Sequence, residues 1–190
     1  MDKKTKIHLA LSPSGNKLNI PTDLPVIFTA GPIRNAPKWQ QEAVRLFLER
    51  NQEVFIATPI REVADDLKPF VERDWDGYEQ FQRQRAWEQH YLYAAAKKGC
   101  IIFWLPKESE TKEVQDKVYA HITMLELGEW IVRKKNDPSI NLVIGTDGNF
   151  PEWPTIMFEL VTEIPSVHIC MSLEDTVDKA LMLCGENNAH

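Results

Sequence analysis

The chain has 190 residues, of which 43% are hydrophobic and 26% are charged. This length fits a single domain over residues 1–190, and this composition supports a sizeable core, which excludes disordered and fibrous proteins. The net charge of -6 argues against a protein whose main work is to neutralise phosphate backbones, so we expect no nucleic-acid polymer as a partner.

No apolar stretch reaches the ~18 residues that a membrane span needs, and the apolar run at residues 7–11 is too short for a signal-peptide core. We therefore expect a cytoplasmic protein that does not contact membranes. The three cysteines lie in apolar runs and the five histidines are scattered, which disfavours disulfides and metal sites. Neither the dinucleotide nor the phosphate-loop glycine motif occurs, so we expect no metal and no cofactor.

Turn-forming residues separate two short apolar runs at the start of the chain. These runs span residues 7–11 and 17–20, and the segment between them contains Ser12, Pro13, Gly15 and Asn16. This pattern predicts a β-hairpin, because a dense turn cluster between two strand-like runs favours antiparallel pairing. Residues 1–24 would then be an N-terminal extension of a core that covers residues 25–185.

Strand-like and helix-like segments alternate through the core. The predicted strands, in chain order, are residues 26–30, 54–57, 100–105, 140–144 and 167–171. The predicted helices that follow them begin after Asn35, at Glu79, at Thr123, at Pro154 and after Ser172. We expect Asn35 and Ser172 to cap the first and last of these helices through their side-chain oxygens.

Alternating strands and helices predict an α/β fold with right-handed crossovers. We expect a doubly wound, mostly parallel, five-stranded sheet with helices on both faces. In such sheets the site lies beyond the carboxyl ends of the strands, where the strand order reverses. In a flavodoxin-like order this point lies between the first and third core strands, so residues 31–34 and the segment from Pro106 onward would meet there.

Carboxylates are the most promising candidates for chemistry. Glu126 lies within an apolar stretch near the start of the helix that follows the third core strand, where the helix N-terminus can keep a nucleophile ionised. The alternative is an ordinary solvated helix residue. Asp74 and Asp76 flank Trp75 in the long loop 60–78; they can bind a sugar and donate a proton, or they can be turn residues.

Several segments together resemble the nucleoside 2-deoxyribosyltransferase-like family. The matching segments, in order, are residues 28–33 (Phe-Thr-Ala-Gly-Pro-Ile), Trp39, residues 74–76 (Asp-Trp-Asp), 84–88 (Gln-Arg-Ala-Trp-Glu), 101–106 (Ile-Ile-Phe-Trp-Leu-Pro) and 125–130 (Leu-Glu-Leu-Gly-Glu-Trp). The resemblance covers residues 25–135 and implies a flavodoxin-like fold and a homo-oligomer.

The resemblance also implies cleavage of an N-glycosidic bond by double displacement. Glu126 matches the family's nucleophile, which forms a glycosyl ester that a second nucleobase or water resolves. The turn at Gly31, Pro32 and Ile33 would line a pocket for a nucleoside or nucleotide. Its possible walls, each of which can equally be a core residue, are Trp39, Trp75 and Trp104.

One departure from the family concerns the acid that protonates the leaving base. The family has Ala-Asp before the third core strand, whereas this chain has Lys98, Gly99 and Cys100. Unless Asp74, Asp76 or Glu88 replaces that acid, protonation is weakened, and such an acid is typically worth ~10²–10⁴ in rate.

Two functions therefore remain open for the same predicted pocket. The first is an enzyme that transfers or hydrolyses the N-glycosidic bond of a nucleoside or nucleotide. The alternative is a catalytically impaired nucleoside- or nucleotide-binding protein, and a purely structural α/β protein is a third interpretation. Arg34 and Lys38 can contact a 5′-phosphate, and they can equally be surface charges.

Overall fold

The computed structural model describes residues 8–11, 24–60, 65–66, 81–112, 114 and 117–187. Strands and helices alternate along these residues. In chain order they are β1 (His8–Leu11), β2 (Val26–Ala30), α1 (Trp39–Arg50), β3 (Phe55–Thr58), α2 (Phe81–Lys98), β4 (Gly99–Leu105), α3 (His121–Asn136), β5 (Leu142–Thr146), α4 (Trp153–Glu163), β6 (His168–Cys170) and α5 (Leu173–Asn187).

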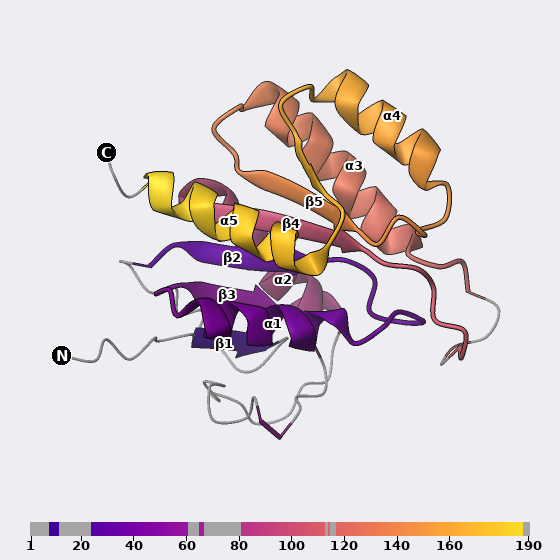
Figure 1. The fold of residues 1–190 in the computed structure, drawn as a ribbon, viewed down its shortest axis with the longest axis horizontal. Helices are drawn as coiled ribbons and strands as arrows, with labels where there is room; N and C mark the ends of the chain where they lie inside the picture. Colours follow the sequence, from indigo (N-terminus) through magenta and orange to yellow (C-terminus); the bar gives the residue numbers. More distant parts are fainter. Residues whose placement is uncertain are drawn as a thin grey trace.

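The strands form one parallel sheet in the order β1-β3-β2-β4-β5-β6 (Figure 1). Without β1, this is the 2-1-3-4-5 order of a flavodoxin-like fold, as the sequence predicts. The chain adds β3 on one side of β2 and then crosses to add β4 on the other side. The strand order therefore reverses between β2 and β4, in the middle of the sheet.

Both faces of the sheet are covered by helices, which explains the uninterrupted apolar runs of the central strands. Along β4, Ile101 and Phe103 pack into a core cluster shared with α2, α3 and α4. Ile102 and Cys100 alternate with them and pack on the opposite face, against α1 and α5. Every residue of β2 and β4 is buried, so these two strands fix the position of everything attached to their carboxyl ends.

The first run of the predicted N-terminal hairpin is a strand, β1, and it pairs in parallel with β3, with Leu9 opposite Ile56. This parallel pairing was not predicted from the sequence. The open edge of β3 offers unpaired backbone groups, and pairing with them satisfies a lone strand. The second predicted run, at residues 17–20, lies outside the described residues.

The predicted cap at Asn35 is wrong. Helix α1 begins later, at Trp39, with Lys38 at the N-cap and no capping side chain. Asn35 adopts the left-handed conformation at a φ of 57° and bonds to a distant loop instead. The cap at Ser172 is confirmed, because its Oγ accepts a bond of 3.1 Å from the backbone N–H of Asp175. Within the described part of the chain, none of the helices combines the length and apolar character of a bilayer crossing.

Candidate functional site

A cavity of about 990 Å³ opens at the carboxyl edge of the sheet, where the strand order reverses. Its lining comes from the loop after β2, the end of β3, helix α2, the loop that leads into α3, and the first turns of α1 and α3. The location is the one predicted from the fold class. The volume matches the upper range of small-molecule sites, so a ligand as large as a nucleotide fits.

The loop after β2 forms one wall through Gly31, Pro32 and Ile33, all of which line the cavity. Gly31 has a φ of 152°, and a Cβ there would lie 2.4 Å from the carbonyl oxygen of Trp104. Only glycine therefore allows the chain to turn so closely over β4. The indole N–H of Trp39 donates a 2.9 Å bond to the carbonyl oxygen of Pro32 and holds the turn from below.

The two tryptophans predicted as walls and described by the structure do not line the cavity. Trp39 and Trp104 are 4% and 6% exposed and belong to the core cluster on the α1 and α5 face. The alternation of β4 turns the Trp104 side chain away from the cavity, and Trp39 supports the Gly31 turn through its hydrogen bond. Trp75, together with Asp74 and Asp76, lies outside the described residues.

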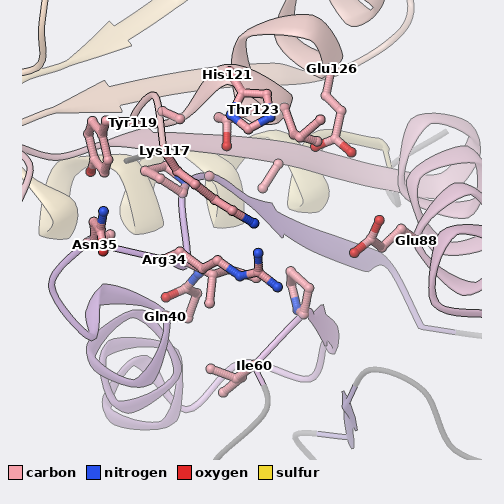
Figure 2. Close-up of a pocket in the computed structure, with 18 of the residues that line it drawn as sticks. Arg34, Asn35, Gln40, Ile60, Glu88, Lys117, Tyr119, His121, Thr123 and Glu126 are labelled. Atoms are coloured by element: carbon pink, nitrogen blue, oxygen red, sulfur yellow. The ribbon is translucent and has the colours of Figure 1, made fainter. Parts of the chain in front are cut away.

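Two carboxylates and one guanidinium meet at one end of the cavity. Glu126 comes from α3, and Arg85 and Glu88 come from one face of α2, three residues apart. The Nη1 atom of Arg85 contacts Glu126 and lies 3.3 Å from Glu88. The side chains of Glu126 and Glu88 are only 13% and 17% exposed, and Figure 2 shows both carboxylates at the same end.

Glu126 is in the second turn of α3, because the helix begins at His121. The predicted stabilisation by the helix N-terminus falls off within the first turn, so it is not what keeps this carboxylate ionised. Burial raises the pKa of the Glu126 carboxyl group, and the charge of Arg85 opposes that rise. Arg85 is therefore the cation that favours the ionised form.

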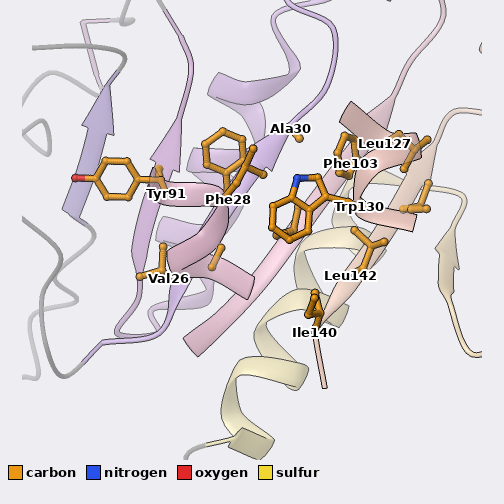
Figure 3. Packing of buried hydrophobic residues seen from close by; sticks show 14 of the residues in the cluster. Val26, Phe28, Ala30, Tyr91, Phe103, Leu127, Trp130, Ile140 and Leu142 are labelled. Atoms are coloured by element: carbon orange, nitrogen blue, oxygen red, sulfur yellow. The ribbon is translucent and has the colours of Figure 1, made fainter. Parts of the chain in front are cut away.

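The packing of α3 turns Glu126 toward the cavity. Leu127 and Trp130 are 1% and 2% exposed, and both pack into the core with Phe103 and Leu142 (Figure 3). With these residues fixed inward, the neighbouring Glu126 lies at the margin of the buried face. Its carboxylate can therefore reach both the cavity and Arg85 without breaking the core.

The missing acid at position 99 has no bearing on this cavity. Gly99 begins β4 and pairs with Val26 at the amino edge of the sheet, opposite the edge where the cavity opens. A Cβ at this position would lie 1.9 Å from the carbonyl oxygen of Val26, so no side chain fits there. The second carboxylate of the described cavity is Glu88.

Cationic side chains enter the cavity away from the carboxylates. Arg34 and Lys38 were candidates from the sequence and both line the cavity, whereas Lys117, from the loop before α3, was not a candidate. Figure 2 shows the heads of Arg34 and Lys117 turned into the cavity and toward each other. Asn35 links the two loops that carry them: its Nδ2 donates to the Val114 carbonyl oxygen at 2.9 Å, and its Oδ1 accepts from the Val114 N–H at 3.0 Å.

Sequence reasoning missed Arg85, Lys117 and Gln40 as cavity residues. Arg85 lies in residues 84–88, one of the segments that resemble the family, and its spacing of three from Glu88 puts both on one helix face. Lys117 and Gln40 follow the two strands at the switch point, so the fold class alone could have marked their segments. Their inward orientation depends on contacts that are remote in sequence.

Comparison with known proteins adds no relatives. No protein-family model matches the chain, and no curated protein matches it.

Proposed function

We propose that this protein cleaves the N-glycosidic bond of a nucleoside or nucleotide by double displacement, with Glu126 as the nucleophile. The observation that carries the proposal is the partly buried group of Glu126, Arg85 and Glu88 in a nucleotide-sized cavity at the switch point. The sequence resemblance to nucleoside 2-deoxyribosyltransferases supports the same role for Glu126.

In the first step, an ionised oxygen of Glu126 attacks the anomeric carbon of the sugar. The C–N bond breaks, its electron pair leaves with the base, and a glycosyl ester forms through an oxocarbenium-like transition state. The departing nitrogen takes a proton from Glu88, which acts in its protonated form and becomes a carboxylate. In the second step, water or another nucleobase attacks the same carbon, its proton passes to Glu88, and the bond to Glu126 breaks to release the Glu126 carboxylate.

One nitrogen of Arg85 contacts both carboxylates, so a single cation orients the proposed nucleophile and the proposed acid. Arg85 is a positioning residue, which orients the nucleophile and keeps it ionised.

The test is chromatography of free nucleobase after incubation with deoxyribonucleosides, ribonucleosides and their 5′-monophosphates. Glu126→Gln keeps the size of the side chain but removes the nucleophile, so we expect base release to fall at least ~10³-fold. The matched control is Glu129→Gln on the same helix, where Glu129 is exposed and pairs with Arg133. Full activity in Glu126→Gln would refute the assignment.

A second acceptor base in the incubation separates transfer from hydrolysis. Exchange of one base for another indicates a transferase, and release without exchange indicates a hydrolase. A binding-only protein is the second candidate, because the ion pair with Arg85 also reduces the nucleophilicity of Glu126. That interpretation predicts saturable nucleoside binding by calorimetry and no free base in any incubation.

A further inference from the structure

The wall of the cavity formed by Arg34 and Lys117 holds positive charge without a matching carboxylate. Among the described residues, no Asp or Glu forms an ion pair with either side chain, although most other arginines of the described chain have one. Figure 2 shows the guanidinium and the ammonium group converging inside the cavity. Two like charges that converge repel each other, and an anion between them removes that repulsion.

Two helix N-termini reach the same cavity. The first turns of α1 and α3 both contribute lining residues, and neither helix has a capping side chain. First-turn N–H groups have no acceptor within their own helix, and the peptide dipoles give each N-terminus a partial positive charge. Anions bind at such positions, so both helices add to the charge of Arg34 and Lys117.

Gln40 supplies an independent observation. It is the second residue of α1, lines the cavity and is only 2% exposed. Its amide Nε2 is buried and has no hydrogen-bond partner among the described residues. A buried N–H donor without an acceptor is costly, so its place in the wall of a cavity points to an acceptor atom supplied by a ligand.

We propose that this wall is a phosphate subsite, and that the preferred substrate is therefore a nucleoside 5′-monophosphate rather than a free nucleoside. The inference rests on the proposed function and deepens it. A phosphate ester carries up to two negative charges and three terminal acceptor oxygens. It accepts bonds from several directions at once, as the Arg34 fork, the Lys117 ammonium group, the Gln40 amide and two helix ends require.

The division of the cavity fits this substrate. Glu126 and Glu88 occupy one end, where the sugar–base bond would react, and a phosphate there would be repelled by both carboxylates. Arg34 and Lys117 lie away from these two carboxylates. A 5′-phosphate on the far side of the sugar from the base places each charged group of the ligand against protein charge of opposite sign.

Calorimetry with 2-deoxyribose 5-phosphate and with 2-deoxyribose tests the subsite without any need for turnover. We expect the phosphate form to bind at least tenfold more tightly to the wild type. Arg34→Gln and Lys117→Gln should each lose tenfold or more of the affinity for the phosphate form. Lys97→Gln, an exposed residue in the last turn of α2 outside the cavity, is the matched control and should bind as the wild type does.

Kinetics then give the preference, which is kcat/KM for a nucleoside 5′-monophosphate divided by kcat/KM for the same nucleoside. We expect a preference of at least tenfold that falls in both variants. If nucleosides are cleaved with the same kcat/KM as their monophosphates, the phosphate subsite is refuted while the proposed function stands. If no base is released but sugar phosphate binding depends on Arg34, the proposed function fails and the subsite stands.

Equal affinity for 2-deoxyribose and its phosphate would overturn the inference, and so would phosphate binding that survives both substitutions. Arg34 and Lys117 are exposed, so we expect both variants to fold. Thermal unfolding of the free proteins verifies this before binding is compared.

Discussion

The ionisation of Glu126 sets the pH dependence that the proposed mechanism requires. Burial raises the pKa of its carboxyl group above the ordinary value of about 4.5 for glutamate. A nucleophile must be ionised, so activity is lost as the pH falls through this raised pKa. We therefore expect the acidic limb of kcat/KM to lie above pH ~4.5, and a profile of kcat/KM against pH on one substrate measures it.

Substitution of Arg85 should move the acidic limb of this profile to still higher pH. In Arg85→Met the side chain still fills space, but the charge that opposes the burial effect on Glu126 is gone. The pKa of Glu126 then rises further, and the acidic limb of kcat/KM shifts to higher pH, whereas Arg85→Lys keeps the charge and should shift it less. A limb that stays in place or moves to lower pH in Arg85→Met would show that Glu126 is not the titrating nucleophile.

Glu126 could be singled out from the sequence, and its partner could not. A carboxylate inside an apolar stretch after the third core strand is visible in the order of residues. The pairing with Arg85 joins positions 41 apart, and it exists because α2 and α3 pack side by side on one face of the sheet. The roles of Trp39 and Trp104 also depend on remote contacts, so they were not predictable. No sequence signal distinguishes an aromatic residue in a cavity wall from one in the core.

At the scale of elements, the loops that follow β2 and β4 are held together by Asn35. Its buried amide makes both hydrogen bonds to Val114, and its carbonyl oxygen accepts a 2.7 Å bond from the Ser109 N–H. Asn35 also tolerates the left-handed backbone that this position requires. One residue therefore fixes the distance between the loops that carry Arg34 and Lys117.

Asn35→Ala removes the side-chain bonds to Val114 and to Glu108, and it leaves the Val114 groups without their partner. We expect the free energy of unfolding to fall by about 1–3 kcal/mol and KM for a phosphate-bearing substrate to rise. Chemical denaturation and steady-state kinetics measure the two effects. Asn136→Ala, at an exposed position at the end of α3, is the control and should change neither by much. An unchanged KM in Asn35→Ala would show that the loops hold their positions without this link.

The elements differ in how well the sequence predicts them. The central strands β2 and β4 are buried on both faces, so each is an uninterrupted apolar run between turn residues. The start of α1 and the pairing of β1 are decided by remote contacts. Asn35 has the side chain of a cap but bonds to Val114, 79 positions away. Strand β1 pairs with β3, which follows β2 and α1 in the chain.

For the whole molecule, the cavity joins the two halves of the sheet. One half contributes the β2 loop, the end of β3 and α1, and the other contributes the loop after β4 and α3. Helix α1 packs into one core cluster and α3 into the other, on opposite faces of the sheet. A ligand that contacts Arg34 from one half and Lys117 from the other therefore adds a contact between the halves, and this arrangement exists only in the folded chain.

Binding of this kind raises the stability of the whole domain. At 100 times its dissociation constant, 2-deoxyribose 5-phosphate should add about 2.7 kcal/mol to the free energy of unfolding. For a chain of this size that corresponds to a rise in Tm of about 5–11 °C, which thermal unfolding followed by circular dichroism measures. Glu126→Gln should still show a rise in Tm with this ligand, because the phosphate contacts remain. Arg34→Gln should lose most of it at the same ligand concentration, since its affinity falls. A rise in Tm of equal size in Arg34→Gln would show that the ligand does not connect the two halves through this residue.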